Sequence, residues 1–479
     1  MQSHSHAQES ESAAGPRALG KIISGGLLAL IAFTSLAFGA VEPWSITGFA
    51  MVVTGLLVLW MVKAVLDRQL SVTFPATLFP LLALFLYGCV QCLSKRDSDG
   101  STVAISYDVE ATRLSVEVIG YLALAMLLAA NFLGSRERVA WLRNFLIVFG
   151  LAMAVFGLVQ HFTWNGKFYW VIQPTGPTPF PFGPYVNHNH FAGFVEMIAP
   201  IPLALILVRA VRGEIWMFYG FAAVMMILAN VMSLSRGGMI SLVAGVMIVI
   251  LLSLSPEAQG RREHFGRTRR QLPVFASRLA AVAVLLASVG VGLWWVGADP
   301  VIRRMEKGEL SLKERGNDPR NETFFQSRGW IWRDSAAMIR ANWITGVGLG
   351  AFQTAYPIYS RNDGTIFVSQ AHNDYLQIVA DAGLPGALLT LWFLFLLVRD
   401  ASRARRHRDP AIAGMAIGCA GGAGALLVHS LFDFNLQLPA NALLFLVLTA
   451  VVSTLGAAAK AGRVNPALVE RTSRARMAA

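Results

Sequence analysis

Charged residues are scarce in this sequence, and their scarcity excludes an ordinary soluble protein. Asp, Glu, Lys and Arg make up 14% of its 479 residues and hydrophobic residues make up 55%, whereas a soluble domain has about 25% charged residues. The hydrophobic residues gather in runs of roughly 17–23 residues, long enough to cross about 30 Å of hydrocarbon as helices. One membrane-embedded bundle is therefore expected, in place of the several soluble domains that the length alone suggests.

Cysteine is also scarce, with three residues in the chain. Cys89 and Cys92 lie near one end of the third hydrophobic run, and Cys419 lies inside the eleventh. Three thiols in apolar surroundings are the favoured interpretation, and a Cys89–Cys92 redox pair is the alternative. Histidine pairs at the spacing of a helical metal site are lacking too, because His188 and His190 are only two positions apart. No metal and no other cofactor is expected.

The hydrophobic runs predict an all-α polytopic membrane protein with about twelve transmembrane helices. The runs lie at approximately 20–40, 45–63, 74–93, 117–133, 141–161, 190–209, 214–233, 237–254, 278–297, 383–399, 411–431 and 438–457. The polar segment before the first run has no signal-peptide cleavage pattern, so we expect this run to remain as a membrane anchor.

Most of the basic residues behind the net charge of +12 lie on one side of the predicted spans. By the positive-inside rule that side is cytoplasmic, so both termini are expected in the cytoplasm. The short loops on the other side carry only five basic residues, namely Lys95, Arg96, Arg113, Lys167 and Arg236. A cluster such as Arg261–Arg270 is expected to lie against anionic lipid headgroups. Membrane lipids are therefore expected partners, and nucleic acid is not.

One connection between the predicted spans is much longer than the others. It comprises residues 298–382, lies on the outer side and contains helix-like stretches such as Trp330–Ile339. A connection of this length with its own structure usually carries function. The predicted organisation is a cytoplasmic tail at 1–19, nine spans within 20–297, the outer loop at 298–382, three spans within 383–457 and a cytoplasmic tail at 458–479.

Five polar clusters interrupt or cap the spans, and all of them are expected at the outer surface. They are Asn187–His190 with Glu196 two turns further on, Ser233–Gly238, Ser327–Arg333 with Gly346–Gly350, Ala371–Leu376, and His429 with Asp433 and Asn435. Each also has a purely structural explanation: His190 can anchor a helix end at the interface, and Arg236 can cap a turn. Gly346–Gly350 lacks the Lys-Ser/Thr of a phosphate loop, so a tight turn is favoured there.

Considered together, the clusters predict one polar site beside the membrane. Arg236, Arg328 and Arg333 carry planar guanidinium groups that suit bidentate binding of phosphate or pyrophosphate oxygens. A histidine such as His372 can accept a proton from an attacking hydroxyl. The supporting residues of this site are expected to be Asn189, His190, Glu196, Asn373, Asp374, His429 and Asp433. Such a set of groups fits a lipid-linked pyrophosphate better than a soluble substrate.

In these residues the chain resembles the O-antigen ligase and O-antigen polymerase superfamily. The resemblance runs from about residue 185 to 440 and depends on the order and spacing of short motifs. They are Asn-His-Phe-Ala-Gly at 189–193, Ser-Arg-Gly-Gly at 235–238, Arg328 before Ile331-Trp332, Gly-Val-Gly-Leu-Gly-Ala-Phe at 346–352, His-Asn-Asp-Tyr-Leu at 372–376 and His-Ser-Leu-Phe-Asp-Phe at 429–434. The first 180 residues carry no such motif.

The resemblance implies a metal-independent, inverting glycosyltransferase with a fold similar to other GT-C enzymes, active at the periplasmic face of the bacterial inner membrane. Its donor would be a glycan on undecaprenyl pyrophosphate. By this analogy Arg236 and Arg328 bind the pyrophosphate, with Arg333 as a second candidate for the loop arginine, and His372 activates or orients the acceptor hydroxyl. Members of the superfamily transfer glycan to lipid A–core, to a growing polysaccharide or to protein. An O-antigen ligase is favoured, and the other two acceptors are alternatives.

A membrane transporter is the alternative from another functional class. Glu196, His190 and Arg236 would then line a solute pathway, because ionisable residues inside a membrane often do so. The sequence shows no convincing internal repeat and no paired broken helices, which many transporters have. A purely structural scaffold would leave the clustered arginines and histidine without a role. Glycan transfer is therefore the favoured function.

Overall fold

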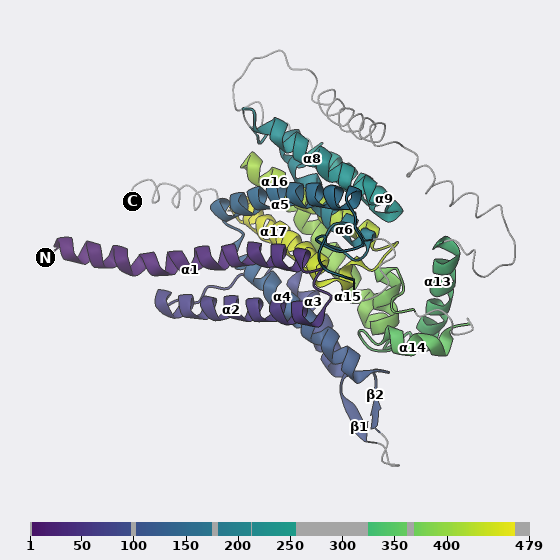
Figure 1. Ribbon diagram of the computed structural model, residues 1–479. Helices are drawn as coiled ribbons and strands as arrows, with labels where there is room; N and C mark the ends of the chain where they lie inside the picture. The colour runs from purple at the N-terminus through teal and green to yellow at the C-terminus, as the bar shows by residue number, and fades with distance from the viewer. Residues whose placement is uncertain are drawn as a thin grey trace.

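The computed structural model describes residues 2–96, 102–174, 181–211, 213–254, 324–361 and 368–464. These residues form a bundle of long helices with a smaller helical segment at one end (Figure 1). In chain order the elements are α1 (Gln2–Leu36), α2 (Pro43–Asp67), α3 (Leu78–Gln91), β1 (Ser94–Arg96), β2 (Thr102–Ala104), α4 (Val109–Phe132), α5 (Arg136–Phe162), α6 (His188–Ile198), α7 (Pro200–Leu207), α8 (Ile215–Met232), α9 (Arg236–Ser253), α13 (Phe324–Ala341), α14 (Phe352–Tyr359), α15 (Asp374–Ala404), α16 (Pro410–His429), the 3-10 helix η2 (Asn435–Gln437) and α17 (Pro439–Val464).

Ten spans among the described residues are long and apolar enough to cross a membrane. The protein is therefore an all-α polytopic membrane protein, as its hydrophobic runs predict. The third predicted run forms the shorter apolar helix α3, and the ninth, 278–297, lies outside the described residues. The described chain departs from an all-helical fold only at a small antiparallel hairpin of β1 and β2, which connects α3 to α4.

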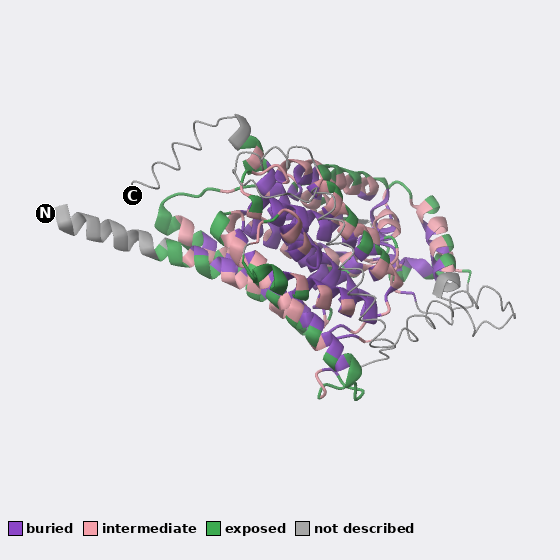
Figure 2. Cartoon of the chain, turned by 90° about the horizontal axis from the view of Figure 1, so that it is seen from above, coloured by how far each residue is buried: buried purple, intermediate pink, exposed green. Residues whose placement is uncertain are grey.

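Helix α16 occupies the middle of the bundle and is rich in glycine and alanine. A Cβ added at Gly418 would lie 2.6 Å from Ile201 Cα in α7, and one added at Gly421 would lie 3.0 Å from the carbonyl oxygen of Gly245 in α9. Small residues therefore let these backbones approach closely, as they commonly do inside membranes. The apolar stretch of α16 is 78% buried and that of α2 only 22%. Figure 2 shows this contrast between a buried centre and exposed outer helices.

Two spans are interrupted. The sixth predicted run, 190–209, is divided into α6 and α7 at Ala199, because Pro200 has no N–H to continue the helical hydrogen bonds. Helix α15 begins at Asp374, earlier than the predicted start at 383, and its backbone leaves the helical conformation at Gly383 (φ 58°, ψ −145°). The predicted start of the span thus coincides with a kink in a longer helix.

The described part of the outer segment forms a small core of its own, built on α13, α14 and the Gly346–Gly350 turn. The three glycines of this turn have φ angles of 71°, 112° and 77°, a region that residues with a Cβ rarely adopt. The amide of Val347 donates to the carbonyl of Ala380 at 2.9 Å. This geometry confirms the tight turn. Trp332 Nε1 donates to the carbonyl of Ala371 at 3.0 Å, which joins α13 to the residue just before His372.

Candidate active site

Asp433, in the turn between α16 and α17, lies at the centre of a buried polar cluster. Its side chain is 1% exposed, and its Oδ1 is 3.0 Å from His372 Nδ1. Its Oδ2 accepts a hydrogen bond of 2.6 Å from Asn189 Nδ2 and lies 3.4 Å from Arg328 Nη2. The partners come from α6, α13 and the start of α15. The fold therefore brings four of the predicted site residues into direct contact.

The electrostatics of this cluster depend on the pairing of Asp433 with its neighbours. Burial raises the pKa of Asp433, but the hydrogen bond from His372 and nearby positive charges, including Arg328, outweigh burial and hold that pKa below its ordinary value. Burial lowers the pKa of Arg328 to about 10, and Asp433 opposes this shift. Asp433 is therefore ionised and Arg328 protonated at neutral pH. The cluster holds a charge pair and not an isolated buried charge, which would be costly.

His372 is held in place by the cap of α15. Asn373 Oδ1 accepts hydrogen bonds of 3.0 Å from the amides of Tyr375 and Leu376, as an N-cap residue does. Asp374 is buried, and its Oδ2 accepts a hydrogen bond of 2.8 Å from Ser430 Oγ. The two supporting residues predicted beside His372 thus tie the start of α15 to its own backbone and to the end of α16. They position the histidine rather than meet the solvent themselves.

His372 has a side chain that is oriented by Asp433 and is partly exposed. Its φ is 50°, a conformation that is uncommon for residues other than glycine and is frequent at functional sites. Because the carboxylate of Asp433 can only accept, Nδ1 of His372 donates to it, and in the neutral tautomer Nε2 is the nitrogen with the lone pair. The His372 side chain is 32% exposed, against 1% for Asp433. This arrangement, a base oriented by a buried carboxylate, can accept a proton from a bound hydroxyl.

Arg236 begins α9 immediately after its N-cap, Ser235, whose Oγ accepts from the amide of Gly238 at 3.0 Å. The next residue, Gly237, allows a close approach: a Cβ there would lie 3.0 Å from the ring of His429 and 3.3 Å from Phe432 Cβ. The half-buried Arg236 is thus placed beside the turn that contains Asp433.

Arg328 reaches the same turn from α13, because its Nη1 donates to the carbonyl oxygen of Phe432. Gly237 lies against the side chain of that same Phe432. Gly237, the neighbour of Arg236, and Arg328 therefore both contact Phe432, although Arg236 and Arg328 are 92 positions apart in the sequence. Arg328 is 6% exposed, so it lies deeper than Arg236.

His429 and Glu196 form a second buried pair of side chains, close to Gly237. His429 Nδ1 is 3.0 Å from Glu196 Oε1, and the two side chains are 1% and 0% exposed. His429 also packs against Gly237, so the pair joins α6, α9 and α16 directly behind Arg236. Both residues were predicted as supporting residues, and their burial fits a structural task rather than contact with substrate.

His190 lies beside an aromatic residue that the sequence reasoning missed. The ring of Phe434 is 4.8 Å from that of His190 and 4.9 Å from that of His372, edge to face in both cases. Asn441, inside α17, was missed as well: its Nδ2 donates to the carbonyl of His190 at 3.0 Å. In the sequence, Asn441 could have been singled out because it is a lone asparagine within a hydrophobic run. The signal for Phe434 was its place at the end of the His-Ser-Leu-Phe-Asp-Phe motif at 429–434.

Arg333 does not join the cluster. It forms an ion pair of 3.0 Å with its neighbour Asp334, and its side chain is 47% exposed. Asp334 in turn accepts a hydrogen bond of 3.4 Å from the hydroxyl of Tyr356 in α14. This chain of contacts stabilises the packing of α13 against α14. Of the two candidate loop arginines, Arg328 is the one that lies beside Asp433 and His372.

An apolar groove of about 440 Å³ begins next to this cluster. Asp374 and Gln437 line one end, and side chains of α3, α4, α15 and α17 line the rest, as far as Leu394 on α15. From Asp374 to Leu394 a helix rises by roughly 30 Å. The groove therefore extends from the polar cluster toward the middle of the bundle.

Comparison with known proteins gives one match. Residues 221–391 match the family model described as O-Antigen ligase, a stretch that contains Arg236, Arg328 and His372, whereas Asn189 and Asp433 lie outside it. No curated protein matches the chain. Proteins of this family carry out glycan transfer with glycan and lipid-linked substrates. The chain is therefore a multi-pass membrane protein, and its residues 221–391 are similar to the O-Antigen ligase family.

Proposed function

We propose that the protein transfers a glycan from an undecaprenyl-pyrophosphate donor to an acceptor hydroxyl, as an O-antigen ligase at the periplasmic face of the inner membrane. The observation that carries this proposal is the contact of 3.0 Å between His372 and the buried carboxylate of Asp433, on a chain that matches the O-antigen ligase family. A transporter needs no such oriented base. Arg328 also lies 3.4 Å from Asp433, and positive charge near the site can stabilise a pyrophosphate leaving group.

In the proposed reaction, Nε2 of His372 removes the proton from the acceptor hydroxyl as its oxygen attacks the anomeric carbon of the donor glycan. The new carbon–oxygen bond forms on the face opposite the breaking bond to pyrophosphate, so the configuration inverts. Asp433 stabilises the imidazolium that results. The pyrophosphate leaves with the bonding electron pair, and the positive charge of the arginines stabilises it. No metal takes part in this scheme.

The two arginines have different tasks in this proposal. Arg236 is half-buried at the first turn of α9, where helix amides also attract anions; we assign it the bidentate contact with the pyrophosphate. Arg328 binds Asp433 and the carbonyl of Phe432. It contributes positive charge near the leaving group and keeps Asp433 ionised. Arg333, paired with Asp334, has no part in donor binding.

The apolar groove that begins at Asp374 supports a polyprenyl donor. Its walls are largely aliphatic and aromatic, and it reaches from the polar cluster along α15. An isoprenoid chain placed there keeps its hydrocarbon out of water while its pyrophosphate stays near the arginines. The chemistry of the groove thus agrees with a lipid-linked donor.

Transfer in vitro tests the proposal and its alternatives. Purified protein in vesicles is given an undecaprenyl-pyrophosphate glycan together with one acceptor at a time: lipid A–core, a second lipid-linked glycan, or a protein. A glycan attached to lipid A–core is the expected product. Elongation of the second lipid-linked glycan would assign a polymerase instead, and transfer to none of the three would contradict glycan transfer by this chain.

Transfer should continue at an unchanged rate in the presence of EDTA. The proposed scheme stabilises the leaving pyrophosphate with guanidinium groups, so chelation of divalent ions removes nothing that the reaction uses. The rate is measured before and after dialysis against the chelator. A loss of activity that returns on addition of Mg²⁺ or Mn²⁺ would refute metal independence while leaving the assignment of His372 open to its own test.

The proposed orientation predicts the labelling of introduced cysteines. Cys89, Cys92 and Cys419, all free thiols, are first replaced by serine. A cysteine at Trp343, which lies in the outer segment and is 56% exposed, should then react with an impermeant thiol reagent in intact cells. A cysteine at Arg405, after α15, should react only once the membrane is permeabilised. The reverse pattern would place the site on the cytoplasmic side.

A further inference from the structure

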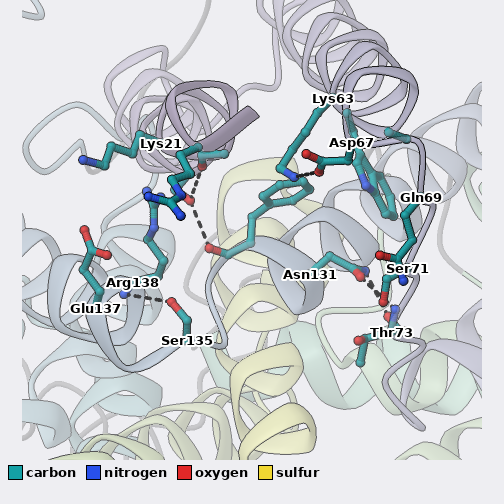
Figure 3. Close-up of a pocket in the computed structure, with 16 residues that line it drawn as sticks. Lys21, Lys63, Asp67, Gln69, Ser71, Thr73, Asn131, Ser135, Glu137 and Arg138 are labelled. Carbon is teal, nitrogen blue, oxygen red and sulfur yellow. Dashed lines mark hydrogen bonds and ion pairs between the residues drawn. The ribbon is translucent and has the colours of Figure 1, made fainter. Parts of the chain in front are cut away.

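A polar cavity of about 830 Å³ lies far from the Asp433 cluster. It is bounded by the middle of α1, the start of α5, the ends of α2 and α4, and the segment 69–73 (Figure 3). Gly134, between α4 and α5, lies against Thr454 of α17, and 15 residues of α17 separate Thr454 from Pro439. At the helical rise this is roughly 22 Å. The cavity is therefore at the opposite end of the bundle from the site.

Basic side chains from three helices converge on this cavity. Arg17 and Lys21 come from α1, Lys63 from α2 and Arg138 from α5. A Cβ added at Gly20 would lie 3.6 Å from Lys63 Cε and 4.0 Å from Arg138 Nη2, so these two cations flank the same point. Figure 3 shows Lys21, Lys63 and Arg138 around the cavity. Cations that different helices place around one point repel each other unless an anion lies between them.

Among the residues that line the cavity, Arg138 gives the most specific evidence for a bound ligand. Its guanidinium lies 4.4 Å from the ring centre of Trp141, a stacked arrangement that fixes its plane and leaves its N–H groups for other partners. Its Nη1 is buried and has no hydrogen-bond partner in the described part of the chain. A buried charged donor without a partner is costly. An anionic ligand in the cavity would remove this cost.

The remaining walls suit a lipid headgroup. Lys63 is paired with Asp67, and with Glu137 the cavity holds two carboxylates against four basic groups, which leaves an excess of positive charge. The rim is held by Asn131, whose Oδ1 accepts from the amide of Thr73 at 2.7 Å. Trp60 also lines the cavity, and its ring packs edge to face on Phe132 at 5.6 Å. Positive charge thus meets an apolar wall between the middle of α1 and the ends of α2, α4 and α5.

We propose that this cavity binds the phosphate-bearing headgroup of an anionic phospholipid. The phosphate would lie between Lys21, Lys63 and Arg138, and the glycerol against Trp60. Basic pockets between the ends of membrane helices are a recognised form of anionic-lipid site. A phosphate ion shares the same chemistry, so the experiment separates the two sources. The proposal depends on neither the donor nor the acceptor of the enzyme, and its failure would leave the function untouched.

The test measures binding of phosphatidylglycerol to the full-length protein, delipidated in detergent, by native mass spectrometry. Phosphatidylcholine and inorganic phosphate at the same phosphate concentration are the comparison ligands. Arg138→Gln and Lys21→Gln should each weaken binding of phosphatidylglycerol by about fivefold, and the double variant by about 30-fold. Arg143→Gln, the same change on the same helix but outside the cavity, is the matched control and should bind as the unaltered protein does.

Three outcomes would overturn the proposal. The first is equal affinity for phosphatidylglycerol in the unaltered protein and the double variant. The second is full displacement of the lipid by inorganic phosphate at the same concentration, which would assign a free-anion site. Because Arg138→Gln also removes the contact with Trp141, Lys21→Gln serves as the variant that leaves the fold intact, since Lys21 is exposed. Unchanged binding in Lys21→Gln together with Lys63→Gln would likewise refute the headgroup site.

Discussion

His372→Ala should transfer glycan about 100- to 10,000-fold more slowly, the range expected when a general base is removed, and should still bind the donor. The proposal assigns His372 to the acceptor hydroxyl, with Nδ1 held by Asp433, whereas the donor pyrophosphate is held by arginine. Single-turnover transfer and retention of the lipid-linked donor, measured on the same purified variant, separate these two effects.

Two variants serve as controls for this result. His407→Ala removes a histidine after α15, at the other end of that helix, and should leave transfer unchanged. Asp433→Asn keeps the shape of the side chain and removes its charge, so His372 loses its orienting carboxylate and the rate should fall by less than in His372→Ala. A normal rate in His372→Ala would show that the proposed mechanism is wrong. If Asp433→Asn fails to fold whereas His372→Ala folds, the result would show that Asp433 stabilises the folded protein.

Arg236→Lys should lose donor binding and lower the transfer rate by about 30- to 1000-fold, which corresponds to the loss of one charge-assisted contact of about 2–4 kcal/mol. Lysine keeps the positive charge but lacks the planar fork that binds two phosphate oxygens together. The helix amides at the start of α9 remain in this variant, so any loss belongs to the side chain. Binding of the lipid-linked donor and the rate of transfer are both measured.

Arg333→Lys is the matched control, because Arg333 was also predicted to bind the pyrophosphate and is instead paired with Asp334. It should bind donor and transfer glycan normally. If Arg333→Lys is as damaging as Arg236→Lys, the division of tasks among the arginines is wrong. Arg328→Lys should differ from both: it weakens the pairing with Asp433 and should slow transfer more than it weakens donor binding.

The membrane bundle was predictable because its signal is local. Each span must be apolar along its whole length to lie in hydrocarbon, and the runs at 45–63 and 237–254 accordingly correspond to α2 and α9. The tight turn at Gly346–Gly350 was predictable for the same reason, since positive φ angles require glycine. The extension of α15 back to Asp374 was not, because residues 374–382 are too polar to read as part of a span and are ordered by the Asn373 cap.

The membership of the site was partly predictable from the sequence. Arg328, His372, Asn189 and Asp433 were singled out by residue type and motif, and the structure joins them. The separation of Arg328 from Arg333 follows from helix geometry: five residues turn the helix by about 140°, so the two side chains leave α13 in different directions. The sequence alone does not say which of those directions faces the α16–α17 turn.

By itself, the sequence determined the helical membrane class, the approximate positions of most of the described spans, and the set of polar residues from which a site can be made. These properties depend on segments of about 20 residues or on single turns. Only the tertiary structure decided that Asp433 is the residue on which Asn189, Arg328 and His372 meet, and that basic residues of α1, α2 and α5 surround one cavity. Such contacts join residues of distant helices, and those around Asp433 depend on how closely a glycine such as Gly237 lets those helices approach.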